Sequence, residues 1–110
     1  MTNLEAKHCV PCSGAATPLS DEQIDMHRAS VPGWEVIEEH GVKRLSKVFT
    51  FAGFNEAMAF AVRVGRLAEE EGHHPAILVE WGRATVSWWT HAIGGLDLND
   101  FIMAAKTDRL

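Results

Sequence analysis

An amphipathic stretch, residues 54–71, lies between two pairs of short segments rich in β-branched and aromatic residues. Its apolar residues recur at spacings of three and four, the period of an α-helix that buries one face. They are Phe54, Ala57, Ala61, Val64 and Ala68. Gly72 follows directly and is a typical residue at the end of a helix. A long helix between two pairs of strands limits the chain to folds that combine helices with an antiparallel sheet.

The flanking segments predict two β-hairpins. Residues 34–39 and 42–51 are joined through His40-Gly41, and residues 76–81 and 85–91 are joined through Gly82-Arg83. Alternating apolar residues in the first pair, and the Val, Ile, Thr and Trp of the second, favour strands. Because strands joined by tight turns pair antiparallel, we expect one four-stranded antiparallel sheet.

Capping patterns predict two further helices. Ser20 is followed three residues later by Gln23, and Asp97 is followed three residues later by Asp100. The first of these helices should end at Val31-Pro32-Gly33, because a residue before proline avoids the helical conformation. The predicted order is α-β-β-α-β-β-α. This order predicts an α+β domain whose three helices pack on one face of the sheet.

The composition indicates one folded domain. The chain has 110 residues, of which 46% are hydrophobic and 23% charged, and its net charge is −5. An acidic chain without a basic cluster disfavours nucleic acid as a partner. No apolar run reaches the roughly 18 residues of a membrane span, and the polar N-terminus lacks the apolar core of a signal peptide. We therefore expect a cytoplasmic protein that binds neither nucleic acid nor membrane.

Residues 1–18 show no periodicity and should form an irregular leader before a single domain of residues 19–110. The leader carries Cys9 and Cys12, a CxxC pair, with His8 beside it. A structural zinc site needs four ligands, and a thioredoxin-like CxxC opens a helix after a strand. A reduced, loosely ordered segment is therefore favoured over a partial metal site or a reversible disulfide.

Three histidines are the main candidates for catalytic side chains. His73-His74-Pro75 follows the long predicted helix directly, and His91 ends the last predicted strand. A two-residue turn at Gly82-Arg83 places His91 opposite His74 in the hairpin, and a three-residue turn places it opposite Pro75. Imidazoles gathered in this way can serve as acid and base near neutral pH.

Simpler interpretations of these residues stay open. Adjacent histidines in a loop are often surface residues, and Trp81, Trp88 and Trp89 are by default core or interface residues. Zinc bound by the three histidines is disfavoured, because adjacent side chains of an extended chain point apart and no carboxylate stands among them at ligand spacing. Phosphate-binding glycine loops and the GxSxG nucleophile motif are absent from the sequence.

One combined motif comprises Glu69, His73-His74-Pro75, Trp81, His91 and Asp100, preceded by Pro32-Gly33-Trp34. This motif resembles the signature of the pterin-4a-carbinolamine dehydratase family. The resemblance covers residues 18–107 and implies a hydro-lyase that converts 4a-hydroxytetrahydropterin to the quinonoid dihydropterin. It further implies an α+β fold, no metal and no organic cofactor. The family forms homodimers or homotetramers and has a functional link to aromatic amino acid hydroxylases, whose pterin cofactor it recycles.

The resemblance also implies roles for single residues. Catalytic roles fall to His73, His74 and His91, and substrate-binding roles to Glu69, Trp34, Pro75, Trp81 and Asp100. Many relatives carry an acidic and an aromatic residue where Ala76-Ile77 stand here. Residues 1–15 lie outside the resemblance, so we expect activity without them. Two alternatives remain: a non-catalytic module of the same fold that binds a protein partner, and a small metal-binding domain that uses the CxxC leader.

Overall fold

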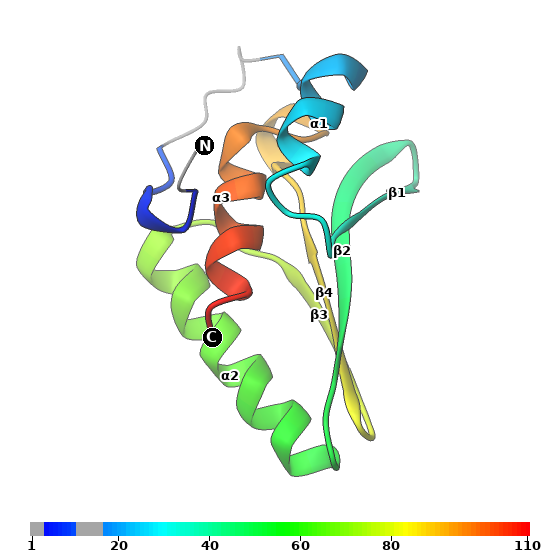
Figure 1. Cartoon of the computed structure of the whole chain (residues 1–110), viewed down its shortest axis with the longest axis vertical. Coiled ribbons are helices and arrows are strands. Elements are labelled where there is room, and N and C mark those ends of the chain that lie inside the picture. Colours follow the sequence, from blue (N-terminus) through cyan, green and yellow to red (C-terminus); the bar gives the residue numbers. More distant parts are fainter. Residues whose placement is uncertain (1–3, 11–16) are drawn as a thin grey trace.

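The computed structural model describes residues 4–10 and 17–110, which form one four-stranded antiparallel sheet with helices on one of its faces (Figure 1). The strands lie side by side in the order β1-β2-β4-β3. They are β1 (Glu35–Glu39), β2 (Val42–Thr50), β3 (Ala76–Glu80) and β4 (Arg83–Trp88). The helices are α1 (Asp21–Arg28), α2 (Phe54–Glu71) and α3 (Leu98–Thr107), with 3-10 turns η1 (Leu4–Ala6) and η2 (His91–Ile93). The predicted α+β fold and its element order are confirmed.

The capping patterns form as predicted. In α1, the Ser20 hydroxyl accepts a hydrogen bond from the Gln23 amide, and the Gln23 side chain accepts one from the Ser20 amide. In α3, Asp97 and Asp100 form the same reciprocal pair. Each box pairs two of the backbone N–H groups that a helix leaves open at its start. Helix α1 ends at Arg28, earlier than the expected end at residues 31–33.

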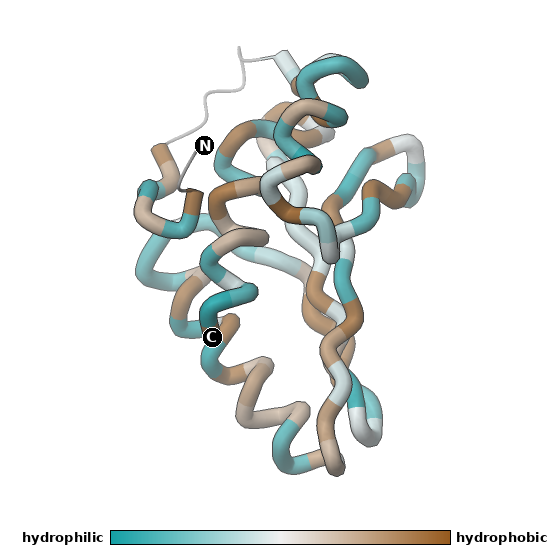
Figure 2. The backbone as a smooth tube through the Cα atoms, in the orientation of Figure 1, coloured by the Kyte–Doolittle hydropathy of each residue, from teal (hydrophilic) through white to brown (hydrophobic). Residues whose placement is uncertain are grey.

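The core lies between the sheet and helices α2 and α3. Most of α1 is hydrophilic, whereas much of α3 is hydrophobic (Figure 2). Accordingly, α1 buries one apolar residue and α3 buries most of its length. The largest contributors to the core are Trp34, Leu45, Phe60, Val64, Val86, Trp88, Phe101 and Met103. Within the described residues, no helix is long and apolar enough to cross a bilayer.

The second hairpin has a different register from the predicted one. Its turn is Trp81-Gly82, not Gly82-Arg83, so Ala76 pairs with Ser87 and Glu80 with Arg83. Gly82 has a φ of 78°, in the left-handed region that favours glycine. The glycine therefore takes the second position of the turn, and the predicted pairing of His91 with His74 or its neighbour is wrong.

The last strand also ends earlier than predicted. Residues 85–91 do not form one strand, because β4 stops at Trp88 and His91 begins η2. Strand β4 pairs with β3 only as far as Ala76 and Ser87, and with β2 only as far as Leu45 and Trp88. Thr90 pairs instead with Gly95, to whose carbonyl its amide donates at 2.9 Å.

Candidate active site

The three histidines line one pocket, although they do not meet through strand pairing. The pocket has a volume of about 210 Å3, and its lining residues are Gly72, His73, His74, Thr90, His91 and Ala92. One side is the segment that follows α2, and the other is Thr90 with the first two residues of η2. The structure therefore brings together the histidines that the sequence singled out, by a route that local patterns did not predict.

The end of α2 determines how the adjacent histidines separate. Gly72 has a φ of 66°, and both its amide and that of His73 donate to the Ala68 carbonyl. This left-handed residue ends the helix and redirects the chain. The His73 side chain is then only 11% exposed, whereas that of His74 is 59% exposed. The two neighbours thus have different surroundings and different partners.

Two side-chain contacts, with Asp100 and Trp88, fix the His73 ring. Its Nε2–H donates to Oδ1 of Asp100 at 2.6 Å, and its ring stacks on Trp88 with a centroid separation of 5.9 Å. Asp100 is fully buried, and its Oδ2 accepts from the Thr90 hydroxyl at 2.8 Å and from the Asp97 amide at 2.9 Å. Because Nε2 carries the proton toward Asp100, Nδ1 of His73 is the nitrogen left to accept from a ligand.

His74 is hydrogen-bonded to Glu69, one of the predicted substrate-binding residues. Its Nε2–H donates to Oε1 of Glu69 at 2.7 Å, and both side chains are exposed. Water screens such a pair, so its stabilising effect is small. Its geometric effect is to orient the His74 ring at the pocket mouth.

His91 has no hydrogen bond from either ring nitrogen to the described part of the chain. Its exposed ring packs against Trp89 with a centroid separation of 4.4 Å. The guanidinium of Arg44 covers Trp89 at 3.7 Å from the ring centroid. Of the three imidazoles, His91 is therefore the one whose two nitrogens are both open to a ligand.

Two of the predicted substrate-binding residues lie away from this pocket. Trp34 is fully buried, and its Nε1–H donates to Asp108 at the far end of α3 from Asp100. Trp81 is 75% exposed in the β3–β4 turn. That turn and Pro75 stand at opposite ends of the five-residue strand β3, and Trp81 and Pro75 are about 20 Å apart at 3.3 Å per residue.

The described part of the leader packs next to the site. Leu4 is buried, and η1 lies beside α3 and the C-terminal end of α2 (Figure 1). Burial, with the carboxylates of Glu71 and Asp100 nearby, raises the pKa of the Cys9 thiol to about 12. The thiol is therefore protonated at neutral pH, whereas a metal ligand has to be a thiolate. Cys12 lies outside the described residues.

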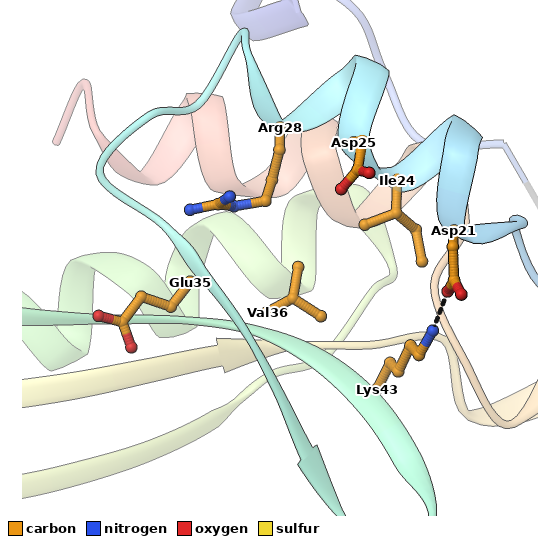
Figure 3. A pocket seen from close by; sticks show the side chains of 7 residues that line it. All are labelled: Asp21, Ile24, Asp25, Arg28, Glu35, Val36 and Lys43. Carbon is orange, nitrogen blue, oxygen red and sulfur yellow. Dashed lines mark hydrogen bonds and ion pairs between the residues drawn. The ribbon is translucent and has the colours of Figure 1, made fainter.

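No group of three His, Cys, Asp or Glu side chains in residues 4–10 and 17–110 is placed to hold a metal ion. A larger pocket, of about 550 Å3, lies between α1 and the β1–β2 hairpin (Figure 3). Its side chains are mostly charged, and Lys43 pairs with Asp21 across it. Its lining residues include none of the three histidines of the family motif, so the histidine pocket is the candidate active site.

The chain's resemblance to known proteins matches this geometry. The family model described as pterin 4 alpha carbinolamine dehydratase matches residues 17–110. The chain belongs to this family.

Relatives in this dehydratase family match the chain closely. A protein of Chlorobaculum tepidum, provisionally named pterin-4-alpha-carbinolamine dehydratase, is 56% identical over all 110 residues and 99% of its own length. One of Marinobacter nauticus with the same provisional name is 54% identical, again over the whole chain and 99% of its own length. Both alignments include the leader.

A solved structure shares the fold of this chain. It is described as a transcriptional coactivator/pterin dehydratase from Brucella melitensis. It has a TM-score of 0.74 and 25% sequence identity, and the match covers 84% of this chain and 97% of that one.

Thr90, Trp88 and Trp89 were not among the residues predicted for the site. Thr90 donates to the same carboxylate that holds His73, and the two tryptophans support the rings of His73 and His91. The position of Thr90 beside His91 was the available signal. The two tryptophans were expected only as core or interface residues.

Proposed function

We propose that the histidine pocket removes water from a 4a-hydroxytetrahydropterin, so that this chain acts as a pterin-4a-carbinolamine dehydratase, a hydro-lyase. The observation that carries the proposal is the placement of His73, His74 and His91 around one pocket in a chain of this family. Two of these imidazoles are oriented by carboxylates, and the third is open.

The reaction needs only proton transfers from the protein. The lone pair of the ring nitrogen forms a C=N bond as the C4a–O bond breaks, and the hydroxyl leaves as water after it gains a proton. A ring N–H proton is lost in the same process, so the products are the quinonoid dihydropterin and water. An imidazolium can supply the first proton and a neutral imidazole can accept the second.

We assign His74 and His91 as the acid–base pair and His73 chiefly to binding of the pterin. His73 suits binding because Asp100 and Trp88 fix its ring and leave Nδ1 as an acceptor. His91 suits proton transfer because its nitrogens are open, and Glu69 orients His74. Pro75 ends the loop that carries His73 and His74.

The proposed activity is tested by following dehydration of 4a-hydroxytetrahydropterin generated in the cuvette by an aromatic amino acid hydroxylase. The expected result is product formation faster than the spontaneous reaction, in proportion to the amount of protein. A rate equal to the spontaneous one at every protein concentration would rule out the proposed activity.

We predict that activity survives removal of metal ions. The proton transfers above use imidazoles alone, so protein dialysed against EDTA should retain its rate. The control is the same protein supplemented with zinc after dialysis. Loss of activity on EDTA treatment and its return with zinc would contradict the prediction.

We further propose that the chain forms homodimers or homotetramers. Three apolar side chains at i, i+4 and i+8, Phe54, Met58 and Val62, are exposed along one face of α2. Contiguous apolar surface of this kind favours contact with another protein surface. The same face could bind a different protein, which is the interaction-module alternative.

Light scattering should therefore give a particle mass of at least twice that of one chain at micromolar concentration. Val62→Glu should shift the particle toward the monomer, because it places a charge in the apolar row. Asn55→Glu adds the same charge to α2 outside that row and should leave the mass unchanged. A monomer mass for the unaltered protein would overturn the prediction.

The proposal includes a cytoplasmic location and a role beside an aromatic amino acid hydroxylase, whose pterin product would be the substrate. Fractionation of cells that produce the protein tests the location. Loss of hydroxylase-dependent growth on deletion of the gene, and its return with the active protein, tests the link.

A further inference from the structure

The leader holds the two helix ends that carry His73 and Asp100. Glu71 is the last residue of α2, two positions before His73, and Asn99 directly precedes Asp100 in α3. Both Glu71 and Asn99 bind the backbone of the leader at Cys9 and Val10. This arrangement joins segments that are more than 60 residues apart in the chain.

Glu71 uses both of its carboxylate oxygens in this contact. Its Oε1 accepts from the Cys9 amide at 2.8 Å, and its Oε2 accepts from Nδ1–H of His8 at 2.9 Å. The Glu71 side chain is only 8% exposed. With the leader in place, loss of either bond would leave part of a largely shielded carboxylate without a partner, which is unfavourable.

Asn99 binds Val10 in both directions. The Val10 amide donates to Oδ1 of Asn99 at 3.1 Å, and Nδ2 of Asn99 donates to the Val10 carbonyl at 2.7 Å. The Cys9 thiol also lies 3.9 Å from the Asn99 carbonyl oxygen, within reach of a weak hydrogen bond. Asn99 is buried, so the leader satisfies groups that the core would otherwise leave unpaired.

Two further contacts fix the leader along α3. Leu4 is buried in the core, and Nζ of Lys106 donates to the Glu5 carbonyl at 3.0 Å. The segment thus has an apolar anchor at one end and the pair of contacts at Cys9 and Val10 at the other. This geometry argues against the expectation that residues 1–15 are dispensable.

We infer that Glu71 and Asn99 are positioning residues, which act with the leader to hold the His73–Asp100 hydrogen bond and thereby the orientation of the His73 ring. The inference rests on the proposed function only for its effect on catalysis. Its structural part concerns the tautomer of His73, which can be measured without any substrate.

The test uses the full chain with Glu71→Leu and Asn99→Leu, each compared with the unaltered protein. Glu71→Gln is the conservative variant, because a Gln oxygen can still accept from the Cys9 amide. Val31→Ala is the control for lost stability, because Val31 is fully buried outside the leader and the site. A chain without residues 1–10 serves as a second route if either leucine variant fails to fold.

The decisive measurement is the 15N spectrum of His73, which distinguishes the Nε2–H from the Nδ1–H tautomer, together with hydrogen exchange of the Cys9 and Val10 amides. The unaltered protein, Glu71→Gln and Val31→Ala should show the Nε2–H form of His73. The leucine variants should show exchange at least tenfold faster at Cys9 and Val10 and a mixture of tautomers. Their kcat/KM should fall about tenfold, mainly through a higher KM, which is less than the roughly 10²-fold that a 1 Å misplacement can cost.

An unchanged His73 spectrum in both leucine variants, with the leader amides released, would overturn the inference. So would leader amides that remain protected in both variants, because the contacts would then not hold the leader. If the unaltered protein shows no dehydratase activity, the proposed function fails, while the tautomer result still decides this inference.

Discussion

Replacing His91 or His74 with alanine should lower kcat by about 10²–10⁴-fold, the usual range for loss of a general acid or base. Each substitution removes a group that the proposal places at the leaving oxygen or at the ring N–H. Because dehydration also proceeds in water, the observable loss should lie toward the lower end of this range. Steady-state kinetics on folded variants, from about pH 5.5 to 8.5 around the titration range of histidine, measures the effect.

The double variant distinguishes a pair that acts together from two independent groups. If His74 and His91 act in one bond-breaking event, the kcat of the double variant should fall by a smaller factor than the product of the two single-variant factors. His73→Ala is the informative comparison, since it should raise KM more than it lowers kcat. Near-normal kcat in both single variants would exclude the assignment.

Asp100→Asn should reduce both stability and activity. The fully buried carboxylate accepts from His73, Thr90 and the Asp97 amide, and an Asn side chain presents an NH2 to one of these donors. A buried donor left unsatisfied costs about 1–3 kcal/mol, and we expect the free energy of unfolding to fall by about 2 kcal/mol. The kcat/KM should fall at least tenfold, mainly through a higher KM, since His73 loses the acceptor that orients its ring for pterin binding.

Asp108→Asn is the matched control for this prediction. Asp108 also accepts two hydrogen bonds, from Trp34 at 3.1 Å and from Lys47 at 2.8 Å, at the other end of α3. Its replacement should lower the unfolding midpoint while kcat/KM stays within about twofold of normal, because no part of the pocket depends on it. Equal losses of kcat/KM in the two variants would mean that Asp100 affects activity only through stability.

Acid should weaken the attachment of Glu71 to the leader. Burial raises the pKa of Glu71, but the bonds from Cys9 and His8 and the charge of Lys106 outweigh it and hold this pKa below its ordinary value. The stabilisation is therefore present above the unfolded-state pKa of about 4.3 and is lost as the pH falls through the lower folded value.

Unfolding midpoints measured from about pH 6 to 3 should then fall more steeply for the unaltered protein than for Glu71→Gln. The Gln variant should already be less stable at pH 6, because it has lost the interaction of the carboxylate with His8. If the unfolding midpoints of the two proteins differed by the same amount at every pH, the predicted loss of the Glu71 contact in acid would be contradicted.

Local patterns predicted the fold well where the signal is local. The α2 helix has the predicted bounds, because its apolar spacing and Gly72 mark its extent, but Phe54 of the predicted buried face is exposed and Phe60 is buried in its place. The capping boxes at Ser20 and Asp97 also formed, since each involves residues only three apart. The end of β4 was mispredicted, because it depends on how far β2 and β3 pair with this strand, and both lie elsewhere in the chain.

The site was predictable in its residue types and less so in its contacts. The histidines were found from their adjacency and from the family resemblance, and the structure places all three at one pocket. The route was wrong, because His91 reaches the pocket through η2. The burial of Trp34 and the docking of Cys9 and Val10 on Glu71 and Asn99 depend on long-range packing that no local spacing encodes.

The most direct test of histidine acid–base dehydration compares the unaltered protein with the His74→Ala/His91→Ala double variant on 4a-hydroxytetrahydropterin at equal concentration. The account predicts clear acceleration over the spontaneous reaction by the unaltered protein, and a loss of kcat of at least about 10²-fold in a double variant with an unchanged fold. A folded double variant that dehydrates the substrate as fast as the unaltered protein would contradict it.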